Sequence, residues 1–166
     1  MSFATTTTQA LWFLPFATPI ALWAMWSDLA RMRIPNASVM ALVTVFAVVG
    51  LIALPLADYA WRWAHLAVVL VVGFVLSVAR ALGAGDAKFA AAMAPFIALP
   101  DIGVFLPLFA AILLASFVAH RLVRRVAALR ALAPDWVSWT SRQFPMGLAL
   151  GGSLIAYLGL AVAYGP

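Results

Sequence analysis

Long runs of apolar residues, separated by short polar segments, extend over the whole chain. Six runs carry no charged residue, and they cover residues 9–27, 34–57, 63–79, 89–100, 102–119 and 143–166. A helix needs about 20 apolar residues, in a range of about 17–25, to cross the hydrocarbon core of a bilayer. Five of the runs reach this length. The pattern therefore predicts an all-α fold, a polytopic membrane protein built as a bundle of six transmembrane helices.

The fourth run differs from the others because residues 89–100 supply only 12 positions. A segment of this length fits a re-entrant segment as well as a crossing helix. It becomes long enough to cross if its helix begins near Asp86. Length alone leaves both interpretations open.

The positions of the ten basic residues favour six crossings. If all six segments cross and the N-terminus lies outside, nine of these residues face the inner side and only Arg62 faces outward. This distribution follows the positive-inside rule. If the fourth segment did not cross, the five arginines of residues 121–142 would lie outside. The charges thus predict periplasmic termini, and they explain the net charge of +5 without a nucleic-acid partner.

Composition narrows the class further. Hydrophobic residues make up 67% of the 166 positions and charged residues only 9%, whereas soluble domains carry about 25% charged residues. The absence of cysteine excludes a disulfide framework, a cysteine nucleophile and cysteine-bound zinc. A secretory signal peptide requires a basic residue before its apolar run, and none precedes the first run here. We therefore expect the first helix to be retained. We expect a single domain over residues 1–166.

The segment of residues 119–142 is the one long loop expected on the inner side. Leu122, Val126 and Leu129 recur at helical spacing among arginines, and two tryptophans follow. This pattern predicts a short amphipathic helix that lies on the anionic lipids of the inner leaflet. Contact with a substrate is the alternative interpretation of the same loop.

Only five acidic residues are available for chemistry. Asp58 and Asp101 neighbour prolines in the outer loops, and Asp135 follows a proline in the inner loop, so all three are expected in turns. Asp28 and Asp86 differ, because each is expected at the inner end of a span.

Taken singly, each of these two aspartates has a structural explanation. Asp28 is expected near a helix C-terminus, where the macrodipole disfavours a carboxylate, and Arg31 could pair with it. Asp86 follows Gly83 and Gly85 in "GAGDAKF". The glycines predict a turn, and the aspartate could cap the helix that starts after it.

Taken together, Asp28 and Asp86 indicate catalysis. Acids in or near hydrocarbon are costly and usually functional. Two carboxyl groups that share a site cannot both ionise cheaply, so one keeps a proton. The ionised member can then activate water, while the protonated member polarises a scissile carbonyl. Glycines beside the pair would let a backbone approach without a Cβ in the way. A proton-coupled transporter is the alternative, although both acids lie at one side rather than along a path.

Three motifs in a fixed order carry a family resemblance. They are an aspartate before "RIPN", then "GxGDxK", then "FPMGLALGGSL" at residues 144–154. Together they span roughly residues 26–154, and they resemble the type IV prepilin peptidase family of membrane-embedded aspartic proteases. The resemblance implies a protease that removes the leader of prepilins on the cytoplasmic side, with the apolar helix of the substrate lying among the spans.

The resemblance also assigns site residues. The catalytic pair maps onto Asp28 and Asp86, and Lys88 occupies the motif lysine, which could orient Asp86. Pro35 ends any helix before it, and Asn36 could cap the second span. No metal and no organic cofactor are expected. The expected supporting residues are Gly83, Gly85, Lys88, Arg31, Arg33, Pro35 and Asn36.

One departure from the family pattern refines the expectation. Longer members add a cytoplasmic insert with paired cysteines and also methylate the new N-terminus. This chain has no cysteine and only a short segment before Asp28. It resembles the short form found with Flp-type tight-adherence pili. We therefore expect leader cleavage in the bacterial inner membrane without methylation, and no methyltransferase domain.

Overall fold

The computed structural model describes residues 3–166, and every regular element among them is helical, as predicted. Helices α1, α2, α3, α5 and α7 are long and apolar enough to cross a membrane. The elements in chain order are α1 (Thr7–Arg31), α2 (Asn36–Ala53), α3 (Leu56–Val78), α4 (Ala84–Met93), η1 (Ala94–Phe96), η2 (Leu99–Asp101), α5 (Ile102–Val123), α6 (Ala127–Ala131), η3 (Val137–Trp139) and α7 (Gly147–Tyr164), where η denotes a 3₁₀ turn.

The fourth predicted span is helical over a different stretch from the one predicted. Helix α4 begins at Ala84, five positions before the apolar run, and ends at Met93. Pro95 follows directly, and proline interrupts an α-helix because it lacks an N–H and clashes with the preceding turn. Two short 3₁₀ turns then carry the chain to Asp101. The predicted six-helix count is therefore approximate: five long helices and one short, broken segment.

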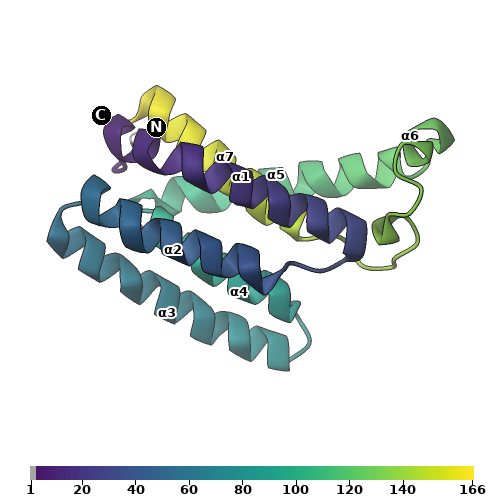
Figure 1. Ribbon diagram of the computed structural model, residues 1–166, viewed down its shortest axis with the longest axis horizontal. Coiled ribbons are helices and arrows are strands. Elements are labelled where there is room, and N and C mark those ends of the chain that lie inside the picture. The colour runs from purple at the N-terminus through teal and green to yellow at the C-terminus, as the bar shows by residue number, and fades with distance from the viewer. Residues whose placement is uncertain (1–2) are drawn as a thin grey trace.

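Both termini lie at the same end of the bundle. The Thr7 N–H donates a hydrogen bond to the Pro166 carbonyl at 3.0 Å, and Figure 1 places the N- and C-terminal labels side by side. A chain whose termini share one end passes along the bundle an even number of times. The five long helices therefore need the segment of residues 84–101 as a sixth pass, which disfavours a re-entrant segment.

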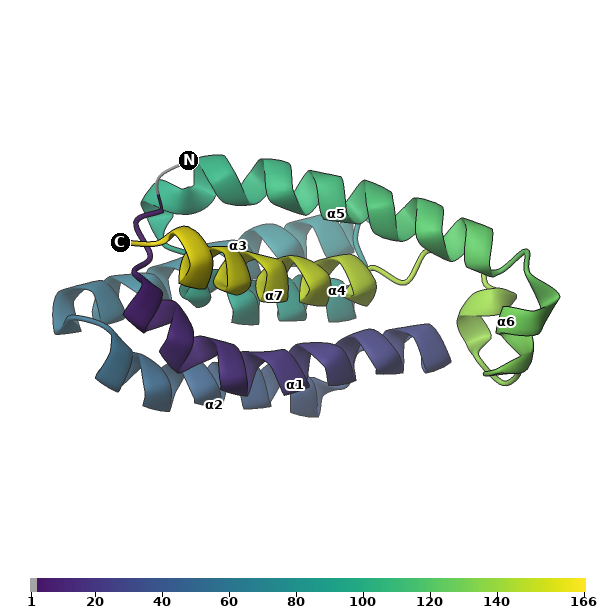
Figure 2. The ribbon, with the colours of Figure 1, turned by 90° about the horizontal axis from the view of Figure 1, so that it is seen from above.

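Helix α7 lies at the centre, between α1 and α5 (Figure 2). Small residues allow α7 to approach α1 closely, as in other membrane bundles. A Cβ at Gly151 would lie 2.6 Å from Met25 Cγ and 3.0 Å from the Ala21 carbonyl oxygen. The same close approach brings the start of α7 to the end of α1.

Helix α4 packs against α3 by a similar device, and Figure 1 shows it beside α2 and α3. A Cβ at Gly73 would lie 3.0 Å from Ala87 Cβ. An aromatic cluster fixes the far end of this segment, since the Phe96 ring lies 5.0 Å from Phe13 of α1 and 5.6 Å from Phe46 of α2. These contacts help to hold the first turn of α4 beside the end of α1 and the start of α2.

Asp101 ends the 3₁₀ turn η2, as the turn prediction expected, but it is buried. It accepts hydrogen bonds from the Ala4 N–H at 2.6 Å, the Thr5 N–H at 3.0 Å and the Tyr157 hydroxyl at 2.6 Å. The reason is that residues 3–5 fold back over this end of the bundle. Asp101 therefore joins the N-terminal segment to α7. The same turn prediction is wrong for Asp58, which lies in the first turn of α3.

The basic loop does not form the single amphipathic helix that was predicted. Helix α5 continues through Leu122 to Val123, and α6 is only five residues long. The loop is instead compacted by a stack of rings, in which Trp139 lies 5.5 Å from Trp136 and 5.5 Å from His120. It projects beyond the end of the bundle opposite the termini (Figure 1).

Candidate functional site

An open cavity of about 490 Å³ lies at the end of the bundle opposite the termini. The end of α1, the turn after it, the starts of α2 and α4, and the segment before α7 all contribute to it. Both aspartates that the sequence singles out line this cavity. Its lining residues are Asp28, Met32, Arg33, Ile34, Pro35, Asn36, Gly83, Ala84, Gly85, Asp86, Lys88, Gln143, Phe144 and Met146.

Asp28 occupies the last turn of α1 and is only 5% exposed. The helix ends just after it, because Met32 adopts a left-handed conformation with φ of 52° and its N–H donates to the Asp28 carbonyl at 2.8 Å. The Asp28 carboxylate accepts a 2.7 Å hydrogen bond from the Gly147 N–H. Gly147 is the first residue of α7, so the carboxylate lies at the positive end of that helix. This contact offsets the unfavourable dipole of α1.

Gly147 contacts the candidate site, although the sequence reasoning did not assign it. A Cβ at this position would lie 2.9 Å from Asp28 Cβ and 3.0 Å from Asp28 Oδ2. Only glycine therefore lets the start of α7 reach the carboxylate without displacing it. The third motif, residues 144–154, contains Gly147 and could have pointed to it. The motif does not indicate, however, that Gly147 contacts Asp28.

Asp86 lies in the first turn of α4 and is partly buried. It is not the N-cap that the structural explanation proposed, because α4 begins at Ala84 and its N-cap is Gly83. The carboxylate lies over Gly83, where a Cβ would come within 2.5 Å of Asp86 Oδ2. Gly83 therefore provides the space that this side chain occupies. Gly85 differs, since a Cβ there would make only ordinary contacts with Ile34, at 3.6 Å.

The two carboxyl groups interact electrostatically. Burial of the side chain, and next the charge of Asp28, raise the pKa of Asp86 to about 6. Free aspartate has a pKa of about 3.9, so Asp86 keeps its proton over a pH range in which an exposed aspartate is ionised. The helix dipole at the start of α4 favours the ionised form, but burial and the neighbouring charge outweigh it.

The rim of the cavity carries two cations, Arg33 and Lys88. The Lys88 ammonium donates to Asn36 Oδ1 at 3.4 Å, which joins the start of α4 to the start of α2. Lys88 thus hydrogen-bonds to Asn36, and its expected role of orienting Asp86 or biasing its charge stays a prediction. Asn36 is the first residue of α2, and Pro35 is its N-cap, so the expected capping role of Asn36 is wrong.

Arg31 is the one predicted site residue that lies away from the cavity. Its guanidinium stacks over the Trp26 ring at 5.5 Å and lines a second pocket, formed with residues 132–136. The proposed pairing of Arg31 with Asp28 is therefore replaced by the Gly147 contact. Arg33 instead fixes the turn after α1, since its carbonyl accepts a 2.9 Å hydrogen bond from the Ser27 hydroxyl.

The arrangement suits acid–base chemistry on a bound carbonyl. Asp28 accepts a backbone hydrogen bond, the pKa of Asp86 is raised to about 6, and both side chains lie beside a cavity that is open to water. Two carboxyl groups in different environments can divide the acid and base roles between them. Within residues 3–166, no three side chains of the types that bind metals are grouped together.

Comparison with known proteins gives one match. The sequence model of the type IV leader peptidase family matches residues 16–122, which is more than half of the chain. The matched range includes Asp28, Asp86 and Lys88, whereas Gly147 lies beyond it. Searches among curated proteins and among solved structures found no match.

Proposed function

Since the chain belongs to the type IV leader peptidase family, and is therefore a multi-pass membrane peptidase, we propose that it cleaves by an aspartic mechanism with Asp28 and Asp86 as the catalytic pair. The observation that carries the proposal is the shared cavity, in which the charge of Asp28 contributes to raising the pKa of Asp86. The family match confirms the resemblance read from the sequence motifs.

In the proposed mechanism the two carboxyl groups have different roles. Asp28 is the base, because the Gly147 N–H stabilises its ionised form. It takes a proton from water as the hydroxide oxygen bonds to the scissile carbonyl carbon. Asp86 is the acid and gives its proton to the carbonyl oxygen. When the C–N bond breaks, Asp28 returns its proton to the leaving nitrogen, and Asp86 recovers a proton from the hydroxyl of the intermediate.

We propose that the cavity faces the cytoplasm. Arg33 and Lys88 line it, and Arg31 lies close by. Arg62, the single basic residue expected outside, lines a small pocket with Ala4 at the opposite end. The positive-inside rule therefore supports a cytoplasmic site and periplasmic termini in a bacterial inner membrane. The exposed arginines of residues 121–142 would lie against anionic lipids of the same leaflet.

The proposed substrate is a prepilin of the Flp type, cut between its short leader and its apolar helix. The family supports a prepilin substrate. The Flp class and cleavage without methylation are proposed from the resemblance to the short form. The given sequence contains no cysteine, whereas longer members carry paired cysteines in an insert.

The test is co-expression with a Flp-type prepilin, in which leader removal is followed by the size of the substrate. Asp28→Asn and Asp86→Asn should each lower the cleavage rate at least about 100-fold, since positioned acid–base groups contribute about that much or more. Asp135→Asn is the matched control, because this exposed aspartate lies at the same end of the bundle. Normal processing by either of the first two variants, at equal membrane levels, would overturn the aspartic mechanism.

A further inference from the structure

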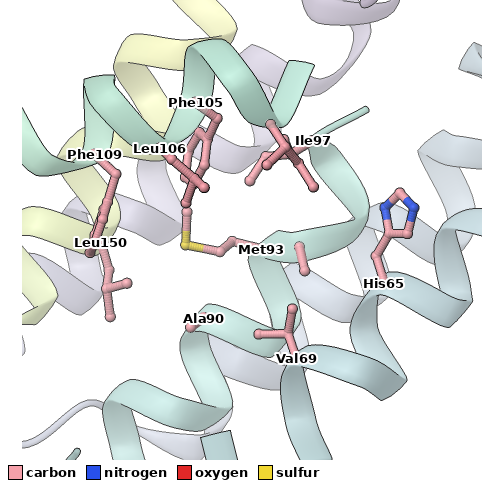
Figure 3. A pocket seen from close by; sticks show the side chains of 11 residues that line it. His65, Val69, Ala90, Met93, Ile97, Phe105, Leu106, Phe109 and Leu150 are labelled. Atoms are coloured by element: carbon pink, nitrogen blue, oxygen red, sulfur yellow. The ribbon is translucent and has the colours of Figure 1, made fainter. Parts of the chain in front are cut away.

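A separate cavity, of about 280 Å³ and almost entirely apolar, opens between α3, α4, α5 and α7. We call it the apolar groove. Figure 3 shows side chains from these helices around it, with Met93 reaching toward Phe105 and Leu106. Met93 and Ile97 form its buried floor, at 3% and 7% exposure, whereas Leu106 on the α5 wall is 56% exposed. The groove is therefore open on the side that lipid covers.

The apolar groove begins one helical turn from the catalytic cavity. On α4, Asp86 lines the cavity and Ala90 lines the groove, four positions further on. On α7, Met146 and Leu150 show the same relationship. Residues four apart lie on one face of a helix, one turn above each other. The catalytic cavity and the apolar groove are therefore lined by successive turns of the same two helices, α4 and α7.

We propose that the apolar groove receives the first turns of the substrate's apolar helix, on the C-terminal side of the cut. This inference rests on the proposed function. A peptide bond held between Asp28 and Asp86 places the following residues beside Ala90 and Leu150. From Asp86 to Met93 helix α4 rises roughly 10 Å, at about 1.5 Å per residue, and it lines the groove from Ala90 onward. A helix that starts just after the cut would bury its first apolar side chains along that length.

The continuity of the two cavities is what favours a substrate helix over a lipid acyl chain. A lipid needs only the apolar wall, and nothing about lipid binding requires the groove to share helix faces with the catalytic pair. A substrate needs both, because its cut bond and its apolar segment are adjacent in sequence. The groove also supplies selectivity, since a polar segment after the cut would lose hydration there without gaining partners.

Photocrosslinking tests the occupant without requiring activity. A photoreactive phenylalanine analogue replaces Leu106 in the groove wall, and in a control protein it replaces Ala111. Ala111 is exposed on the same helix but lies about 140° around it from Leu106. With a Flp-type prepilin in membrane vesicles, position 106 should give several-fold more substrate adduct than position 111, at sites in the first turns after the cut. Equal yields, or adducts of position 106 with lipid alone, would overturn the proposal.

The second test fills part of the apolar groove with a larger side chain. Ala90→Leu should lower cleavage of the full prepilin by about tenfold, because the larger side chain would occupy space that the substrate helix needs. Ala111→Leu is the control and should leave cleavage unchanged. If Ala90→Leu cleaves prepilin normally, the groove is not used. The two proposals fail separately. Active Asp28→Asn or Asp86→Asn variants would reject the catalytic pair, whereas the crosslinking pattern and the Ala90→Leu variant decide the groove.

Discussion

The Gly147 N–H donates a 2.7 Å hydrogen bond to the Asp28 carboxylate across 119 positions of sequence. The contact joins the end of the first helix to the start of the last one. It gives the carboxylate a backbone donor at a helix N-terminus, where negative charge is stabilised. The third motif thus belongs to the site, although it contributes no acid or base of its own.

Replacing Gly147 by alanine should impair catalysis strongly. The added Cβ would lie 2.9 Å from Asp28 Cβ, so the carboxylate or the start of α7 must move. A displacement of about 1 Å can cost about 100-fold in rate, and we expect a loss of about 10- to 100-fold in kcat. Cleavage of prepilin by purified protein in detergent or nanodiscs measures it. Gly159→Ala is the control, because nothing lies within 4 Å of its added Cβ. A similar loss in both variants would contradict a specific role of Gly147.

The two glycines of "GAGD" should respond differently to alanine. A Cβ at Gly83 would lie 2.5 Å from Asp86 Oδ2, whereas a Cβ at Gly85 would lie 3.6 Å from Ile34. Gly83→Ala should therefore lower kcat by about tenfold or more, through displacement of the acid. Gly85→Ala should keep kcat close to the original value. The reverse order would indicate that the motif serves contact with substrate rather than placement of Asp86.

The cleavage rate should fall as the pH rises through the pKa of Asp86. The proposed acid must be protonated, and its pKa is raised to about 6. Above that pH, kcat/KM of the free enzyme should decline toward tenfold per pH unit.

Asp28→Asn removes the neighbouring charge, which is the smaller of the two causes, so the pKa of Asp86 should fall while staying above that of a free aspartate. Carboxyl ¹³C NMR of aspartate-labelled protein measures this shift in the inactive variant. An unchanged pKa would mean that the two groups do not interact.

The buried contact between Tyr157 and Asp101 should stabilise the fold without affecting catalysis. The Tyr157 hydroxyl donates to Asp101 at 2.6 Å and accepts from the Ala98 N–H at 3.3 Å. Tyr157→Phe leaves these buried partners short of a hydrogen bond, which costs about 1–3 kcal/mol. Thermal unfolding should therefore begin at a lower temperature, while kcat at low temperature stays unchanged. Tyr164→Phe, at an exposed tyrosine, should change neither quantity. A loss of kcat in Tyr157→Phe would show coupling between the two ends of the bundle.

The sequence was sufficient for features that depend on local pattern. Apolar runs separated by polar segments predicted the long helices, and the charge distribution predicted an even number of passes. The position of Asp28 and Asp86 at the inner ends of their spans predicted that the two would share a depth, and the structure places both at one cavity.

The features that the sequence did not reveal depend on contacts between distant segments. The sequence predicted a turn at Asp101 but not its burial, which depends on residues 3–5 folding over it, with Ala4 bonded to it across 97 positions. Gly147 resembles any helix-starting glycine until α1 and α7 pack closely. The start of α4 also shifted, because Gly83 adopts the extended N-cap conformation and the helix begins before the aspartate. None of these contacts has a periodic or compositional signature.

The pairing of the first helix with the last one sets an order for biosynthesis. Translation delivers α1 to the membrane early and α7 at the end. Until α7 inserts, Asp28 lacks its backbone donor and stands at the unfavourable end of its own helix. We therefore expect a nascent chain that already carries both acids to gain proteolytic competence only after α7 has inserted.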